Sequence, residues 1–147
     1  MSLAMTKAER EAFLADVHVG VVSIPEPGGA PVTVPIWYRY APGGAVEFIT
    51  DRESRKGRLL AVGTRLALCA QSEQAPYKYV TVEGVVTALD PVDLERDTRA
   101  IAHRYLGPQR GDLYVQATGS ETAGSMLVRV RPERWRTVDY AKQFGGL

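Results

Sequence analysis

A run of basic residues lies between a predicted strand and a predicted helix, within residues 46–60. The strand, residues 46–50, alternates apolar and polar side chains, and Ser54 is placed to cap a helix whose first turn holds Arg55 and Lys56. The start of a helix offers unpaired N–H groups and partial positive charge, so it favours an anion, usually phosphate. The pattern predicts a phosphate-binding corner or, in the plainer interpretation, a basic helix face in water.

Few other residues have the types or spacing that catalysis by side chains needs. The candidate bases for a hydrolytic triad are His18 and His103, and no Gly-x-Ser-x-Gly elbow is present. Cys69 and two distant histidines do not form a zinc site, so no metal is expected, and the Gly-rich nucleotide-binding patterns are absent. An enzyme with this sequence therefore needs a cofactor to supply the reactivity.

Aromatic side chains offer flat surfaces for such a cofactor. The candidates are Trp37, Tyr38, Tyr77, Tyr79 and Trp135. Aromatic residues most often belong to a core or an interface, and that interpretation holds for each of them. Trp37 is the strongest candidate to line a wet cleft, because it shares a strand face with Pro35 and Arg39 rather than with the aliphatic residues of its strand.

The elements that position these residues are mostly short strands. Strands are predicted at residues 19–24, 31–40, 46–50, 65–71, 77–89, 126–130 and 135–139. Helices are predicted at residues 6–16, 54–62 and 90–106, and residues 107–124 are predicted to form a loop. Short strands with few long connections favour a mainly β protein, a small antiparallel β-barrel with a few helices.

Three residue patterns predict local detail. Thr6 and Glu9 form a capping box at the start of the first helix. Pro35 cannot donate to a sheet ladder, so its strand lies at an edge or bulges there. Gly84 lies in the middle of a strand long enough to bend around a barrel, and it marks the bend or a close backbone approach.

The composition predicts one soluble domain over residues 1–147. The formal charge of +1 gives no global field for nucleic acid or a membrane surface, so neither partner is expected. A single cysteine excludes an intrachain disulfide and fits a cytoplasmic location. No apolar run approaches the roughly 18 residues of a membrane helix, and no secretory signal is expected.

Five segments in order resemble the FMN-binding split barrels of the pyridoxamine 5'-phosphate oxidase-like family, in particular its flavin and deazaflavin oxidoreductases. They are VGVVSI, GAPVTVPIWYRY, VEFITDRESRKGRLL, YVTVEGVVTALD and LVRVRPERW, and the resemblance covers roughly residues 12–139. It implies a six- to seven-stranded antiparallel split barrel that forms a homodimer, with two cofactor sites in the cleft between the chains.

The resemblance also implies a set of cofactor-binding residues. They are Val34, Pro35, Ile36, Trp37, Thr50, Ser54, Arg55, Lys56, Tyr77, Tyr79 and Trp135. The group from 50 to 56 corresponds to the phosphate site, and backbone groups of residues 34–37 to the polar edge of the ring. The two tyrosines correspond to residues of the partner subunit, and Trp135 to an aromatic residue near the end of the chain. Many relatives have Asn where this chain has Leu59, and losing that polar contact leaves FMN and the deazaflavin coenzyme F-420 both open.

The implied activity is hydride transfer from reduced FMN or F-420 to an unsaturated or quinone-like small molecule. No catalytic side chain is assigned, because solvent or a tyrosine would supply the proton. True pyridoxamine phosphate oxidase activity is not expected, since its substrate-phosphate Arg and His pattern is missing near the C-terminus. We expect the substrate pocket in residues 107–124 and the tail.

Two other functions stay open at this point. One is a non-catalytic flavin or haem binding or carrier protein of the same fold, in which His18 or His103 would have to ligate the haem iron. The other is a dimeric scaffold whose basic turn faces water.

Overall fold

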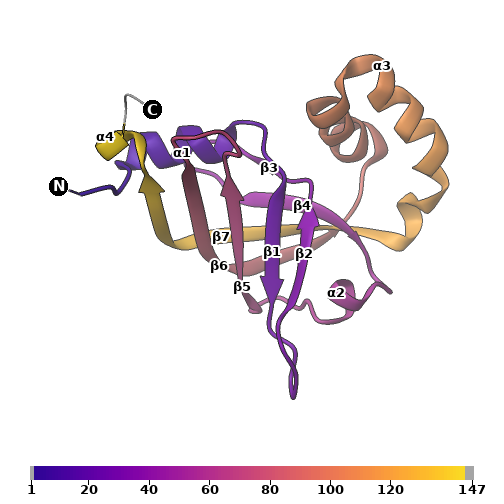
Figure 1. Cartoon of the computed structure of the whole chain (residues 1–147). Coiled ribbons are helices and arrows are strands. Elements are labelled where there is room, and N and C mark those ends of the chain that lie inside the picture. The colour runs from indigo at the N-terminus through magenta and orange to yellow at the C-terminus, as the bar shows by residue number, and fades with distance from the viewer. Residues whose placement is uncertain (1, 145–147) are drawn as a thin grey trace.

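Seven antiparallel strands form one curled sheet. They are β1 (Gly20–Ile24), β2 (Val32–Ile36), β3 (Arg39–Tyr40), β4 (Val46–Asp51), β5 (Arg65–Gln71), β6 (Lys78–Pro91) and β7 (Ser125–Asp139). Their order across the sheet is β2–β1–β5–β6–β7–β4–β3 (Figure 1). The computed structural model describes residues 2–144, so the predicted domain of residues 1–147 is described without its first and its last three residues. The predicted mainly β, antiparallel fold is confirmed.

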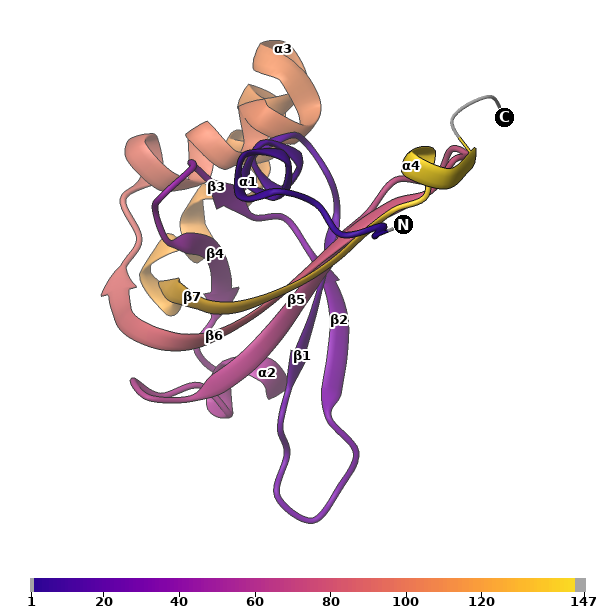
Figure 2. The same ribbon diagram turned by 90° about the vertical axis from the view of Figure 1, so that its left-hand side faces the viewer.

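The helices lie around this sheet and at one end of it. They are α1 (Lys7–Ala15), α2 (Arg55–Arg58), the π-helical segment η1 (Leu94–Arg99), α3 (Ala100–Thr118), the 3-10 segment η2 (Gly119–Gly124) and α4 (Ala141–Phe144). The α3 lobe projects from the sheet on the side away from the two termini (Figures 1 and 2). None of the described helices is both long and apolar enough to cross a membrane.

The first helix begins as predicted. The Thr6 hydroxyl accepts a hydrogen bond from the Glu9 backbone N–H at 3.1 Å, and the Glu9 carboxylate accepts one from the Thr6 N–H at 2.8 Å. This reciprocal pair satisfies two N–H groups that the helix itself leaves unpaired. The capping box is confirmed, and α1 is held over the sheet by the buried Leu14.

The predicted strand of residues 31–40 is wrong in one respect, because it breaks at Trp37 and Tyr38. Its first half, β2, pairs with β1, and its second half, β3, pairs with β4, so the halves lie at opposite edges of the sheet. The Tyr105 hydroxyl occupies the break: it accepts from the Tyr38 N–H at 3.0 Å and donates to the His18 carbonyl oxygen at 2.7 Å. A side chain from the helical lobe thus replaces the missing ladder bonds.

Pro35 and Gly84 have the predicted roles. Pro35 lies in β2, which is an edge strand. A Cβ on Gly84 would lie 2.6 Å from the Arg131 carbonyl oxygen, and the register with β7 shifts between Glu83 and Gly84. The same bulge accommodates Pro132 opposite Gly84, where a ladder N–H is not needed. For this reason the predicted strands 126–130 and 135–139 are one continuous strand, β7.

The prediction for residues 90–124 is wrong at both ends. β6 continues to Pro91, so the helical segment begins after Asp93, whose carboxylate accepts from the Arg96 N–H at 2.7 Å. Residues 107–124 are largely helical rather than a loop, because α3 resumes after a break at Gly107, where φ is 81°. Proline is well suited to the first turn of a helix, so Pro108 restarts the helix instead of ending it.

The core fills the inside of the curled sheet. Its largest fully buried side chains are Tyr38, Phe48, Leu14, Ile24 and Leu68. The Tyr38 hydroxyl donates to the Leu14 carbonyl oxygen at 2.7 Å, and burial raises the pKa of Tyr38, so it stays a protonated donor. The core therefore fixes the segment after β2 against α1.

Candidate functional site

The basic corner lies where β4 passes into α2. The Ser54 hydroxyl accepts from the Gly57 N–H at 3.0 Å and donates to the Asp51 carbonyl oxygen at 2.7 Å, and it lies 3.2 Å from the Thr50 hydroxyl. Ser54 therefore caps α2 as predicted. Its hydroxyl and that of the buried Thr50 therefore take part in the hydrogen bonds that stabilise the turn.

Gly57 makes this turn tight, and the sequence alone did not single it out. A Cβ at this position would overlap the Asp51 carbonyl oxygen. The helix ends after one turn at Arg58, not at residue 62 as predicted, because Leu59 and Leu60 turn towards the core. A single turn has little macrodipole, so the charge of the corner comes mainly from its side chains.

A cavity of about 470 Å³ lies between α2 and the start of β2. Its lining residues are Ala30, Pro31, Val32, Thr33, Val34, Ser54, Arg55 and Lys56. Four of the predicted cofactor-binding residues, Val34 and residues 54–56, are therefore brought together although some twenty residues separate the two groups in the sequence.

The cations of the corner differ in what they bind. Arg55 forms an ion pair of 2.6 Å with Glu26, in the turn between β1 and β2, and Arg58 forms one of 3.2 Å with Glu53. Within residues 2–144, no carboxylate lies at ion-pair distance from Lys56. Lys56 is thus the cation of this cavity whose charge is left for an external anion.

Trp37 is half-buried against the helical lobe, and its place in a wet cleft stays a prediction. Its ring stacks on Tyr105, with centroids 5.1 Å apart and planes 6° apart, and it also contacts the Tyr114 ring at 5.1 Å and 48°. Both tyrosines belong to α3, which the sequence did not connect with this strand. Pro35 is exposed, and Ile36 is a buried core residue.

The predicted residues from the second half of the chain lie elsewhere. Tyr77 is 54% exposed, and its carbonyl oxygen accepts from the Tyr140 N–H next to α4. This end of the sheet, which also carries Tyr79, lies far from α2 in both views (Figures 1 and 2). Trp135 packs under the Arg10 guanidinium, 4.8 Å from its ring centroid, and against the edge of Tyr40. Within one chain, none of these three predicted residues lines the α2 cavity.

The two histidines have separate environments. His18 stacks on Phe13 at 4.2 Å, and desolvation lowers its pKa. The His103 Nε2 atom lies 2.6 Å from the Asp112 Oδ1 atom, between the two parts of α3. No group of three or more potential metal ligands occurs in the described part of the chain.

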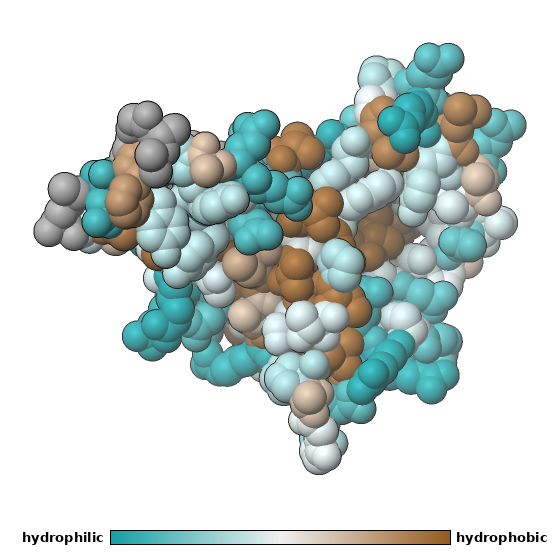
Figure 3. All heavy atoms as spheres, viewed as in Figure 1, coloured by the Kyte–Doolittle hydropathy of each residue, from teal (hydrophilic) through white to brown (hydrophobic). Residues whose placement is uncertain are grey.

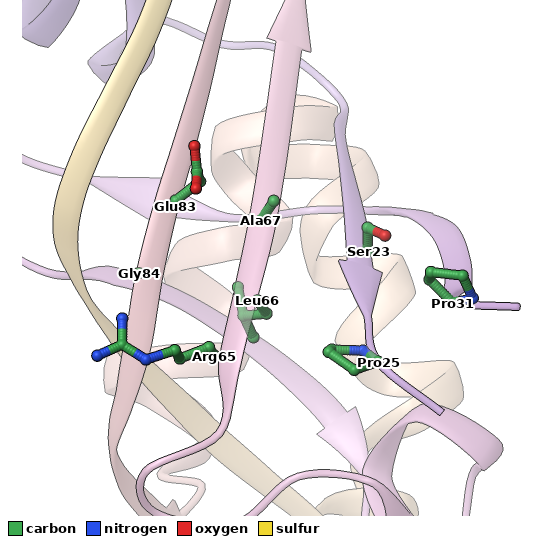
Figure 4. A pocket seen from close by; sticks show the side chains of 8 residues that line it. All are labelled: Ser23, Pro25, Pro31, Arg65, Leu66, Ala67, Glu83 and Gly84. Carbon is green, nitrogen blue, oxygen red and sulfur yellow. The ribbon is translucent and has the colours of Figure 1, made fainter. Parts of the chain in front are cut away.

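A second cavity, of about 270 Å³, lies on the outer face of the sheet. Figure 4 shows side chains from β1, β5 and β6 around it, and the charged ones are paired: Arg65 with Glu133 and Glu83 with Arg136, each at 2.6 Å. Beside these charges, towards β1, lies an uncharged surface. Its members, adjacent in the strand register, are Val21, Ser23, Ala67, Cys69 and Thr81. We call these five residues the neutral outer face.

The sequence model of a family described as pyridoxamine 5'-phosphate oxidase matches residues 6–139. No match was found among curated protein sequences.

Solved structures resemble the chain over 86% to 99% of its length. A conserved hypothetical protein from Mycobacterium tuberculosis has a TM-score of 0.77 at 22% identity, over 99% of this chain and 90% of that one. A protein described as F420 reductase has a TM-score of 0.68 at 20% identity, over 86% and 94%. An FAD and haem binding protein from Mycobacterium smegmatis has 0.66 at 16%, over 92% and 72%. At these identities the likeness shows the fold, which is a split barrel.

Proposed function

Because the chain belongs to the pyridoxamine 5'-phosphate oxidase-like family, we propose that it is an oxidoreductase that binds FMN or the deazaflavin F-420. One observation carries the proposal: Lys56, which has no ion-pair partner within residues 2–144, lines a cavity of about 470 Å³. A compact ammonium group is well suited to a phosphate. Structural neighbours described as an F420 reductase and as FAD-binding proteins support a flavin-type ligand.

The surroundings of Lys56 fit such a ligand. Val34 lines the same cavity, and β2 is an edge strand, so backbone groups on one of its sides have no neighbouring strand. Unpaired edge N–H and C=O groups can bond the polar rim of a ring system. Arg55 would add a second positive charge, shared with Glu26.

The reduced cofactor would supply the hydride for an unsaturated or quinone-like small molecule, and solvent the accompanying proton. The protein's part is to hold the phosphate at Lys56, orient the ring along β2 and exclude water. The lining residues of the cavity include no carboxylate and no imidazole, so the proposal assigns the proton to solvent.

We also propose that two copies of the chain complete the site. The five residues of the neutral outer face carry no charge, and ion-paired side chains of β5, β6 and β7 border them on one side, as polar residues border the uncharged part of a protein interface. Val21, on the β1 side of this face, is 40% exposed. Tyr77 and Tyr79 lie far from the cavity of their own chain, so a role at a cofactor requires that they reach the partner's cavity.

Titration of the purified protein with FMN and, separately, with F-420 tests the proposal. We expect saturable binding of at least one of them, followed by its absorbance and fluorescence. Failure of both to bind would make the proposal wrong, and a Soret band in the purified protein would favour the haem-binding alternative instead.

A further inference from the structure

The α3 helix is folded into two halves that are held together by a small set of contacts. Gly107 separates residues 100–106 from residues 108–118. The Asp112 Oδ1 atom, in the second half, lies 2.6 Å from His103 Nε2 and 2.6 Å from Arg99 Nη1. A Cβ on Gly111 would lie 2.5 Å from the His103 ring, so the halves approach as closely as glycine allows. These contacts fix the direction of the second half.

Trp37 contacts both halves of α3. Tyr105 of the first half stacks on its ring, while Tyr114 of the second half meets the ring at a tilt of 48° and remains 38% exposed. Figure 3 shows apolar side chains in the hollow between the α3 lobe and the strands. The exposed side of Tyr114 thus extends the aromatic surface of Trp37 towards solvent.

This surface is within reach of the α2 cavity. Val34 lines the cavity, and Trp37 follows it by three residues, directly after the end of β2, so the two lie at most about 11 Å apart along the chain. A ligand whose phosphate lies at Lys56 and whose ring follows β2 would therefore end beside Trp37 and Tyr114. The Trp37 and Tyr114 rings would form a flat, uncharged surface beside that end of the ligand.

We infer that Tyr114, with Trp37, forms the surface that binds the substrate, and that it selects flat, uncharged molecules such as quinones. Offset or tilted stacking on aromatic rings favours planar partners. Asp112 acts as a positioning residue, because it holds the helix half that carries Tyr114. The assignment of this surface to a substrate rests on the proposed function, whereas binding of a flat molecule to the surface can be tested without a cofactor.

The test uses the quinone menadione as the probe and Trp37 as the reporter. In a Trp135→Phe background Trp37 is the sole tryptophan, and we expect menadione to quench its emission in a saturable way. Adding Tyr114→Ala should raise the menadione Kd at least fivefold. Leu113→Ala, at the neighbouring apolar residue that is 60% exposed, should change it less than twofold. Equal effects of the two variants, or no saturable quenching, would overturn the inference.

The same titrations separate this inference from the proposed function. They are made on the protein alone and on the protein saturated with FMN or F-420, and we expect Tyr114→Ala to leave the cofactor Kd within twofold of its original value. Loss of cofactor binding would place Tyr114 at the cofactor and contradict its assignment to the substrate. Menadione binding without any cofactor binding would uphold the surface and refute the proposed function.

The positioning role of Asp112 has its own readout. Asp112→Asn should shift the Trp37 emission to the red and speed amide exchange in residues 108–118, and it should raise the menadione Kd about threefold. His103→Gln, which keeps a hydrogen-bonding side chain, should retain most of the original behaviour. If Asp112→Asn changes neither the emission nor the exchange, the positioning role is wrong.

Discussion

The Arg39 Nη2 atom lies 2.6 Å from Oδ1 of Asp97, a carboxylate with no exposed surface. Burial alone raises the pKa of Asp97, but hydrogen bonds from Arg96, the Asp93 N–H and Arg39 outweigh it and lower the pKa to about 2. The carboxylate is therefore ionised and fully paired. Arg39 is the first residue of β3, directly after the break at Trp37 and Tyr38, and Asp97 lies in η1. This ion pair therefore connects the helical lobe to β3 beside the proposed substrate surface.

Asp97→Asn should destabilise the protein strongly. It removes the charge of a fully buried carboxylate that accepts hydrogen bonds from Arg39, Arg96 and the Asp93 N–H, which costs about 3 kcal/mol in the free energy of unfolding. Denaturant unfolding measures this. Asp112→Asn is the matched control, since its ion pair with Arg99 is 56% exposed on the carboxylate side and is screened by solvent, so this variant should lose much less stability. Similar losses in both variants would show that burial of Asp97 does not matter.

The same pair predicts how stability depends on acid. The pKa of Asp97 is about 2 in the folded protein and ordinarily 3.8, so its contribution is complete above about pH 4 and is lost as the pH falls towards 2. Urea midpoints measured between pH 5 and pH 2.5 should fall more steeply for the original protein than for Asp97→Asn. Glu9, whose pKa is also lowered to about 2, accounts for part of the remaining slope, and Glu9→Gln measures that part.

Lys56→Ala should weaken the binding of FMN or F-420 by about 1.5 to 3 kcal/mol, roughly a 10- to 150-fold rise in Kd, because a charge-assisted contact to phosphate is lost. Titration by absorbance measures the change. Arg58→Ala is the control of equal charge: Arg58 is exposed, bound to Glu53 and outside the lining of the cavity, so it should change Kd less than twofold. An unchanged Kd in Lys56→Ala would remove the phosphate site from this corner.

Local features of the fold were predictable because they depend on neighbouring residues. The capping box of Thr6 and Glu9, the Ser54 cap and the close approach at Gly84 all follow from residue type and spacing. The break after β2 could not be predicted from the sequence pattern, because the alternation of side chains continues through residues 37 and 38. Its cause is Tyr105, a residue 67 positions away that no local pattern connects to Tyr38.

The grouping of residues in the basic part of the cavity was predictable, whereas the contacts of the aromatic residues were not. Val34 and Lys56 share a cavity, as the family resemblance implied. The partners of Trp37 come from α3, whose second half was predicted as a loop because Gly107 and Pro108 usually end a helix. Trp135 was assigned from its place near the end of the chain, whereas its contact with Arg10 depends on how α1 crosses the sheet.

Tyr105→Phe should destabilise the fold by about 1 to 3 kcal/mol. The ring and its stacking on Trp37 remain, but the Tyr38 N–H and the His18 carbonyl oxygen lose their partner in a partly buried place. Thermal or denaturant unfolding measures the loss. Tyr114→Phe removes the hydroxyl of an exposed tyrosine and should cost less than about 0.5 kcal/mol. A neutral Tyr105→Phe would mean that water replaces the hydroxyl at the break.

Val21→Arg tests the proposed dimer. Two arginines buried in an interface formed by this uncharged face would be desolvated without a partner, so the variant should be a monomer by light scattering while the original protein is a dimer. Val62→Arg, at an exposed valine in the turn after α2, should leave the dimer intact. If Tyr77 and Tyr79 complete the partner's site, the Val21→Arg monomer should also bind FMN or F-420 at least about tenfold more weakly, although its Lys56 cavity is unchanged. A monomeric original protein, or a monomeric variant with full affinity, would show that one chain forms the whole cofactor site.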